Sequence, residues 1–277
     1  MAILLADIGG TNARFRWSKN GKLGPLFDYK CDDFKAPLDV VNQALKDFPN
    51  KLNGIVLAGA GPVQKKALTW TNRPKWKISE KELQKKYHIR KAVVVNDLQA
   101  QGEGLKMLYK CTETTILMTA GTGLGGCFIT NGQVIPGEIG QVRTEDGRKK
   151  EDTISGFGIV RLYHSFGGDR KIKSARKIEA LRDEKDIPAQ KAFKTFYQEW
   201  GKLSARLATA LYAKGGIYLW GGLIPKREPD KKVLMNAYKN TLPKTFQKIP
   251  LRLVKDKALS FKGLTSLSHR EFGRSLK

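Results

Sequence analysis

The sequence predicts a mixed α/β fold with one large domain or two ordinary ones. Short apolar segments alternate with segments of helical periodicity along most of the chain. Two of the apolar segments end in a glycine-rich turn that leads into a further strand. The length of 277 residues, with 40% hydrophobic side chains, is enough for a sizeable core, so wholesale disorder is excluded.

The first hundred or so residues are predicted to form a compact α/β unit. Its expected elements are strands at 3–5 and 13–17, a helix at 37–48, a strand at 54–58, a helix at 79–87 and a strand at 92–95. The first two strands enclose Asp7-Ile-Gly-Gly-Thr-Asn12, a turn built around two glycines, and so predict a hairpin. Ser79 and Glu82 have the spacing of a capping box at the start of the second helix.

The rest of the chain predicts a second α/β unit. Its expected strands are 115–119, 127–130, 133–135, 216–220 and 249–254, with helical periodicity over 161–214 and a last short helix. Gly121–Gly126 is a glycine-rich turn, and Asn131-Gly132 predicts a tight hairpin. The clearest helix, over 193–212, carries the stripe Leu203, Leu207, Ala210 and Leu211, which predicts core packing.

The formal charge of +25 makes nucleic acid a partner to consider. The basic residues are scattered through almost every segment, which favours a lysine-rich solvated surface over a dedicated nucleic-acid face. No apolar stretch is long enough to cross a bilayer, and Asp7 comes too early for a signal peptide, so we expect a cytoplasmic protein with no membrane contact. Three widely spaced cysteines predict neither a zinc site nor a disulfide framework.

The two glycine-rich turns predict phosphate binding, because backbone N–H groups can approach an anion where no side chain intervenes. The alternative is that both are only tight hairpins. Gly121, Gly123 and Gly126 satisfy G-x-G-x-x-G, but a strand rather than a helix is expected after them, so a dinucleotide fold is excluded. The chain also contains no P-loop motif.

Seven motifs in order resemble those of bacterial-type glucokinases, members of the hexokinase, actin and Hsp70 ATPase superfamily. They are Leu5–Phe15, Thr71-Asn72 with Trp76, Val95–Asp97, Ala120–Gly125, Pro136–Gly140, Ser155-Gly156 and Trp220–Pro225. The zinc motif of the related repressor and sugar-kinase group is absent, which favours the non-zinc glucokinase branch.

The resemblance implies a two-lobed actin-like ATPase (ribonuclease H-like) fold, with a cleft between a small and a large α/β domain. The expected small domain is 1–107 plus 256–277, and the large domain is 108–255. The implied activity is transfer of phosphate from ATP to D-glucose, with Mg²⁺ as cofactor. A homodimer is compatible with this assignment.

The resemblance also assigns the donor side and the base. Asp7 should hold Mg²⁺ through water. The first phosphate turn should consist of Gly9, Gly10, Thr11 and Asn12, and the second of Gly121, Thr122 and Gly123. Gly221 and Gly222 should contact adenosine. Asp97 matches the catalytic base, since a carboxylate there can accept the proton of the 6-hydroxyl of the sugar; the alternative role for Asp97 is a helix N-cap.

The implied sugar ligands are amides and carboxylates, which suit vicinal hydroxyls. They are Asn72, Asn96, Asp97, Glu138, Gln141 and Glu151. Gln141 stands where the family has histidine, which leaves the preferred hexose open. Glu151 lies among charged residues and has a solvated charge as its alternative reading. The C-terminal segment keeps Gly263 but lacks most of the glycines usual in the family there.

Two other functions remain as alternatives. One is a sugar-sensing or regulatory protein that keeps the fold without turnover, prompted by Gln141, the C-terminal segment and the charge. The other is a kinase that uses another hexose or polyphosphate. Asp7 and Asp97, kept together with both phosphate turns, favour the enzyme, because a binder has no need of a base beside a metal site.

Overall fold

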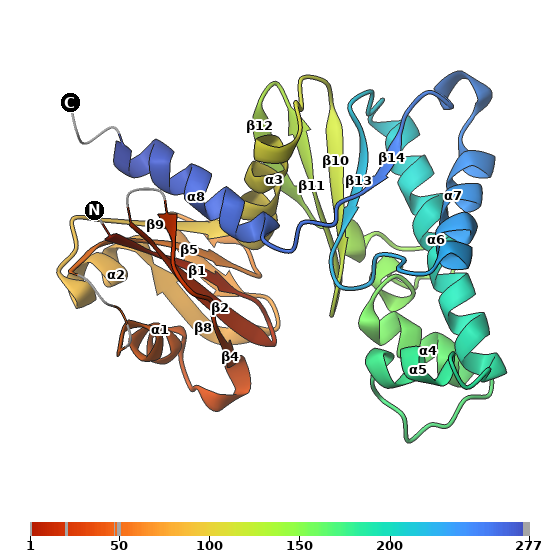
Figure 1. Cartoon of the computed structure of the whole chain (residues 1–277), viewed down its shortest axis with the longest axis horizontal. Coiled ribbons are helices and arrows are strands. Elements are labelled where there is room, and N and C mark those ends of the chain that lie inside the picture. Colours follow the sequence, from red (N-terminus) through yellow and green to blue (C-terminus); the bar gives the residue numbers. More distant parts are fainter. Residues whose placement is uncertain (1, 20–21, 47, 49–50, 274–277) are drawn as a thin grey trace. The chain divides into compact units, whose positions relative to one another are not determined.

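The computed structural model describes residues 2–19, 22–46, 48 and 51–273. The chain divides into two compact units, one formed by Met1–Lys110 with Ala258–Lys277 and the other by Cys111–Lys257. For comparison, the sequence places these boundaries at 107 and 256. Each unit is built around its own mixed sheet (Figure 1).

The N-terminal unit contains a six-stranded sheet of order β3-β2-β1-β5-β9, with β4 also paired to β2. Its strands are β1 (Ala2–Ile8), β2 (Asn12–Lys19), β3 (Lys22–Leu23), β4 (Phe27–Lys30), β5 (Leu52–Gly59) and β9 (Lys91–Asn96). β1 runs antiparallel to β2 and parallel to β5, and β5 runs parallel to β9. The hairpin predicted around the first glycine turn is therefore confirmed.

Helices and a small second sheet complete this unit. The helices are α1 (Pro37–Lys46), α2 (Glu80–Tyr87), α3 (Asp97–Leu108) and α8 (Leu259–Phe272), and the small sheet consists of β6 (Val63–Gln64), β7 (Ala67–Trp70) and β8 (Arg73–Ser79). Cys31–Asp33 forms a 3₁₀ turn after β4. Figure 1 shows the C-terminal helix α8 beside α3, although the two are far apart in sequence.

The alternation of side chains along β1 decides which residues face which helices. Leu4 and Ile8 belong to the core cluster that contains Trp70. Ile3 and Leu5 belong to the cluster on the opposite face, with Phe261 of α8. Because successive strand residues point to opposite faces, the next residue on the α8 face after Leu5 is Asp7.

The second unit has a five-stranded sheet of order β12-β11-β10-β13-β14. Its strands are β10 (Thr115–Ala120), β11 (Leu124–Thr130), β12 (Gln133–Gly137), β13 (Gly216–Trp220) and β14 (Leu251–Leu253). Its helices are α4 (Gly156–Ser165), α5 (Ala175–Leu181), α6 (Ile187–Ala210) and α7 (Glu228–Thr241), and its 3₁₀ turns are 139–141, 150–152 and 244–246.

The two sheets share one arrangement of strands: a hairpin whose first strand also pairs in parallel with a third strand. β10 runs antiparallel to β11 and parallel to β13, just as β1 runs antiparallel to β2 and parallel to β5. Residues 9–11 join the first hairpin and residues 121–123 the second. Each unit thus presents one short glycine-rich turn at the end of its first hairpin strand.

Some expectations at the level of elements were wrong. The described part of α1 ends at Lys46, with residue 47 outside the described ranges and Phe48 not helical. Of the predicted core stripe, Leu203 is buried but Leu211 is 41% exposed. The helix α7 was not predicted, because its buried stripe is narrow and includes the charged Asp230 beside Leu234 and Tyr238.

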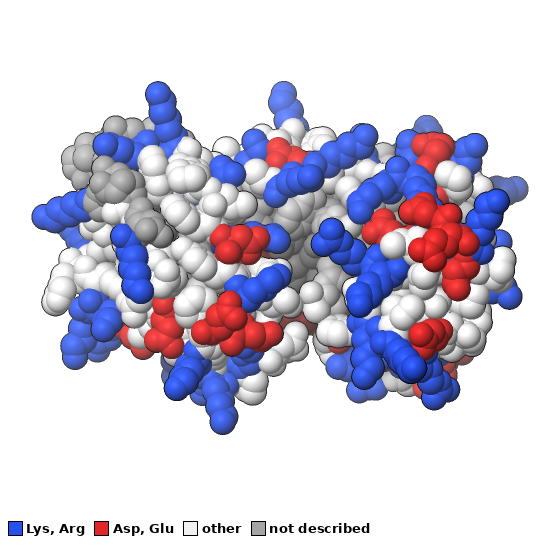
Figure 2. Space-filling view, turned by 60° about the horizontal axis from the view of Figure 1, so that its bottom comes forward, with Lys and Arg blue, Asp and Glu red and all other residues white. Residues whose placement is uncertain are grey.

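Two surface properties bear on partners. Among the described residues, no helix combines the length and apolar character needed to span a membrane. Figure 2 shows Lys and Arg side chains spread over the visible face and interspersed with Asp and Glu. On this face, the basic residues are not gathered on a single element.

Candidate functional site

The first glycine turn, residues 9–11, has two backbone donors to offer. The Gly9 N–H donates to the Asn12 carbonyl at 2.9 Å and closes the turn. The N–H groups of Gly10 and Thr11 have no acceptor among the described residues. Adjacent unpaired backbone donors form a concavity suited to an anion.

The carbonyl groups of this turn, and that of Ile8 directly before it, all accept hydrogen bonds from residues outside the turn. Their donors are Trp70 Nε1–H to Ile8 (2.8 Å), Cys31 Sγ to Gly9 (3.5 Å), Arg73 Nε–H to Gly10 (3.0 Å) and the Cys31 N–H to Thr11 (2.9 Å). The turn is therefore fixed by its acceptors, while two of its donors remain available. The Asn12 amide is engaged elsewhere, since its Oδ1 accepts from Lys30 Nζ at 2.8 Å.

Asp7 is the titratable group closest in sequence to this turn. Burial raises the pKa of its carboxyl above the ordinary value, and the nearby Ser260 hydroxyl and Arg14 guanidinium offset part of the rise. No group of three or more His, Cys, Asp or Glu side chains in the described part of the chain could hold a metal by itself. A lone carboxylate beside a phosphate turn fits Mg²⁺, which is commonly held by one or two carboxylates, substrate phosphates and water.

Asn72, an expected sugar ligand, lies against the same turn. A Cβ built on Gly10 would be 3.7 Å from Asn72 Nδ2, and the Asn72 side chain is exposed. The N-terminal unit thus brings an expected sugar ligand into contact range of the phosphate turn. Sequence order alone, with more than sixty residues between them, does not imply this proximity.

Asn96 and Asp97 mark the junction of β9 and α3, and the structure separates their roles. Asn96 is the N-cap: its Oδ1 accepts from the Leu98 N–H at 2.9 Å, and its Nδ2 donates to the Gly61 carbonyl at 2.9 Å. The alternative reading of Asp97 as the N-cap is therefore wrong. Asp97 is the first helical residue, half-buried, and its Oδ1 also accepts from the Leu98 N–H at 2.9 Å. A buried cap fixes the backbone on which the Asp97 carboxylate is carried.

The second glycine turn, residues 121–123, is closed by the Gly121 N–H donating to the Gly123 carbonyl at 2.9 Å. The Gly121 carbonyl accepts from the Gly156 N–H at 2.8 Å, which ties the turn to the start of α4. Thr122 is exposed. Strand β11 begins at Leu124, so the turn opens into a strand and the exclusion of a dinucleotide fold is confirmed.

One expected sugar ligand, Glu151, also lies against this second turn. Glu151 Oε1 accepts from Gln141 Nε2 at 2.8 Å and lies 3.6 Å from Lys149 Nζ. Glu151 Oε2 would be 3.4 Å from a Cβ at Gly123. The Glu151 carboxylate is hydrogen-bonded to the Gln141 amide and lies beside the turn, and its role as a sugar ligand stays a prediction. Glu138 is exposed, and its side chain has no partner among the described residues.

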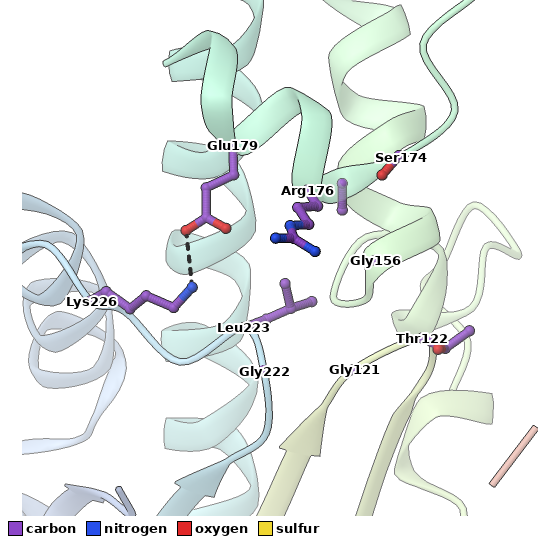
Figure 3. Close-up of a pocket in the computed structure, with 10 residues that line it drawn as sticks. Gly121, Thr122, Gly156, Ser174, Arg176, Glu179, Gly222, Leu223 and Lys226 are labelled. Carbon is purple, nitrogen blue, oxygen red and sulfur yellow. Dashed lines mark hydrogen bonds and ion pairs between the residues drawn. The ribbon is translucent and has the colours of Figure 1, made fainter. Parts of the chain in front are cut away.

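A pocket of about 550 Å³ lies beside the second turn (Figure 3). It is lined by Gly121, Thr122, Gly156, Ser174, Ala175, Arg176, Glu179, Gly222, Leu223 and Lys226. Gly222 has no atom within 4 Å of a built Cβ, so it leaves open space in the pocket. Gly221 acts differently: its φ is +110°, and a Cβ there would be 2.4 Å from the Ala120 carbonyl oxygen. It lets the end of β13 approach the end of β10.

Sequence reasoning missed one wall of this pocket. Figure 3 shows Arg176 and Glu179 of α5 extending into it, with Lys226 opposite. Lys226 Nζ lies 3.3 Å from Glu179 Oε1 and forms an ion pair with it. No motif marks these three residues, because α5 and residue 226 come together only in the folded chain.

Comparison with known proteins yields one family. The profile of the family described as "Glucokinase" matches residues 4–151 and 143–271. A glucokinase of Colwellia psychrerythraea is 26% identical over 269 residues, which cover 80% of this chain and 81% of that protein.

Solved structures show the same fold. A glucokinase from an Antarctic psychrotroph superimposes with a TM-score of 0.74 at 22% identity, covering 97% of this chain and 99% of that one. A ROK family glucokinase from Streptomyces griseus, solved in complex with glucose and AMPPNP, gives a TM-score of 0.78 at 17% identity, covering 98% and 100%. The predicted fold class is confirmed.

Proposed function

The chain belongs to the glucokinase family, and we propose that it transfers the γ-phosphoryl group of ATP to the 6-hydroxyl of glucose with Asp97 as the base. It is a sugar kinase by family. One observation carries the assignment of the site: in each unit, an expected sugar ligand lies against a phosphate turn. Asn72 lies over Gly10, and Glu151 lies over Gly123. Acceptor and donor groups are thus adjacent in both units, as phosphoryl transfer requires.

The donor is held by backbone groups and by the pocket beside α5. The free N–H groups of Gly10 and Thr11 suit phosphate oxygens, and the pocket next to Gly121 suits the nucleoside. Arg176 and Lys226 give this pocket two cationic groups against the single carboxylate of Glu179. Asp7 would orient Mg²⁺ through water, and the ion would neutralise charge on the phosphate oxygens.

Asp97 accepts the proton of the acceptor hydroxyl. As the 6-oxygen attacks the γ-phosphorus, the bond from phosphorus to the ADP oxygen breaks and the hydroxyl proton passes to the Asp97 carboxylate. The buried Asn96 cap and the N-terminus of α3 hold this carboxylate in place. Catalysis is then mainly positioning, because the protein forms no covalent bond to the substrate.

The sugar is bound by a set of amides and carboxylates. Glu138 and Glu151 accept from sugar hydroxyls, while Gln141 and Asn96 can both donate and accept. The hydrogen bond from Gln141 orients Glu151, so the amide that replaces the family histidine has a defined partner. Glucose is the proposed hexose, and a cytoplasmic location is part of the same proposal.

A coupled assay of sugar-dependent ADP release from Mg-ATP tests this function. Glucose, mannose, fructose and N-acetylglucosamine are offered to the wild type, to Asp97→Asn and to Asp169→Asn, a control with the same chemical change on an exposed loop. We expect turnover with glucose, a fall in kcat of about a hundredfold or more in Asp97→Asn, and no change in the control. Glucose binding without turnover in the wild type would overturn the assignment.

A further inference from the structure

We propose that Arg73 is a positioning residue that holds the Gly10–Thr11 peptide so that its N–H faces the phosphate of the donor. Arg73 begins β8, and its Nε–H donates to the Gly10 carbonyl at 3.0 Å. The inference rests on the proposed function, since it assigns the first turn to a nucleotide phosphate.

The geometry of the peptide bond links Arg73 to the donor group. In a trans peptide, the C=O of one residue and the N–H of the next point in opposite directions. An arginine that fixes the Gly10 carbonyl therefore also fixes the Thr11 N–H on the opposite side. That N–H has no acceptor in the described part of the chain, so it is available to a ligand.

This peptide needs such a restraint because Gly10 can rotate. Glycine has no Cβ, and rotation about its ψ angle can invert the peptide that follows it. An inverted peptide would direct the Gly10 carbonyl oxygen, instead of the Thr11 N–H, toward the phosphate. Arg73 is the only described side chain that donates to this carbonyl.

Arg73 is itself held from two sides. Its Nη2 forms an ion pair with Asp32, and its guanidinium carbon lies 4.9 Å from the ring centre of Trp76. The Trp76 indole N–H is anchored on the Lys35 carbonyl at 2.9 Å. The planar guanidinium uses Nε for the carbonyl and a terminal nitrogen for the carboxylate, which the single ammonium of a lysine cannot reproduce in the same geometry. The Arg73 side chain is only 21% exposed, which agrees with a fixed role.

Nucleotide binding in a substituted protein tests the role of Arg73. Arg73→Met removes the donor and keeps most of the side-chain length. Arg90→Met is the matched control, because Arg90 is exposed, lies in the same unit and has no described ion pair. Calorimetric titration with Mg-ADP, and separately with glucose, measures the affinity for each ligand in the absence of turnover. Melting temperatures show whether each variant is folded.

We expect Arg73→Met to weaken Mg-ADP binding by about tenfold, since it loses a charge-assisted hydrogen bond that orients a donor. Glucose binding should change by much less, and Arg90→Met should bind both ligands as the wild type does. Arg73→Lys should remain defective for Mg-ADP, and Asp32→Asn should give a smaller loss because it keeps the Nε–H donor. These two variants carry the test if Arg73→Met does not fold.

Three results would overturn the inference. They are Mg-ADP binding in Arg73→Met equal to that in Arg90→Met, an equal loss of ADP and glucose binding, or full recovery of ADP binding in Arg73→Lys. A wild type that binds Mg-ADP but phosphorylates no sugar would instead count against the proposed function alone.

Discussion

At the scale of single residues, the carboxylate proposed to hold Mg²⁺, that of Asp7, lowers the stability of the native state. Its carboxyl follows Ile3 and Leu5 on the face of β1 that packs against α8, and burial there raises its pKa. A group whose pKa is raised on folding binds its proton more tightly in the native state than in the unfolded chain. Stability is therefore lost as the pH rises from the ordinary carboxyl pKa through the raised value, and the full cost remains at neutral pH.

Asp7→Asn should remove the loss of stability that comes from ionising the buried carboxyl. We expect the variant without ligands to melt at a higher temperature than the wild type at pH 7. The difference should shrink as the pH falls from the raised pKa of Asp7 toward the ordinary carboxyl value and should be absent below it. Added Mg-ATP should stabilise the variant less than it stabilises the wild type, because the carboxylate proposed for Mg²⁺ is gone. Thermal melts from pH 4 to pH 8, with and without Mg-ATP, measure both effects.

Glu271→Gln provides a control of the opposite sign. The hydrogen bond from Lys91, at 3.0 Å, lowers the pKa of Glu271 below its ordinary value. This group stabilises the native state at neutral pH and loses that contribution as the pH falls through its lowered pKa. Glu271→Gln should therefore be less stable than the wild type at pH 7, and equal pH responses in the two variants would contradict this account.

At the scale of elements, the packing of α3 on α8 determines where Asp97 lies. A Cβ at Gly104 would be 2.0 Å from the Leu259 carbonyl oxygen, and one at Gly263 would be 1.7 Å from the Ala100 carbonyl oxygen. The two helices approach closely because each presents a glycine to the backbone of the other. Gly263, which the sequence analysis grouped with the C-terminal glycines of the family, thus packs against the helix that begins with the proposed base.

Gly263→Ala should separate these two helices. Overpacking of this kind costs about 1 to 3 kcal/mol, so a clear fall in melting temperature is expected. The shift of α3 should also lower kcat through Asp97, while Mg-ADP binding changes less. Gly273→Ala is the matched control at the end of the same helix, because a Cβ there meets no atom within 4 Å. Equal melting of the two variants would refute the packing argument.

At the scale of the whole molecule, the two phosphate turns belong to different units of the chain. Residues 9–11 lie in the first unit and residues 121–123 in the second, each with an expected sugar ligand against it. In the proposed reaction both turns serve one ATP and one sugar, so we expect substrate binding to draw the two units together. Exclusion of water on closure would also prevent idle hydrolysis of ATP.

We therefore expect the molecule to become more compact when glucose binds. Small-angle scattering should show a smaller radius of gyration with D-glucose than without sugar, and L-glucose serves as the control of matched composition. The forward intensity of the same curves gives the molecular mass and distinguishes a monomer from a homodimer. An unchanged radius at saturating D-glucose would argue against closure.

The sequence by itself determined the features that depend on local conformation. Two glycine turns between hairpin strands, the strand that ends at Asn96-Asp97 and the order of the family motifs could all be read from neighbouring residues. These signals are local because glycine, alternating apolar residues and turn dipeptides act within a few positions of themselves. The assignment to the glucokinase family follows from the same motifs and agrees with the family profile.

Only the tertiary structure decided which side chains fix the first glycine turn and which residues complete the pocket beside the second. Trp70 reaches Ile8, directly before the first turn, from 62 residues away, and Arg73 reaches Gly10 in the turn from 63 residues away. The α5 wall of the pocket has no motif. The folded backbone was also needed to show that Asn96 is the N-cap of α3 and that Asp97 is its first helical residue. Such contacts join segments that are distant in sequence, and no pattern in either segment specifies its partner. They form because a compact chain must give its buried carbonyl groups donors and must fill the space between its helices.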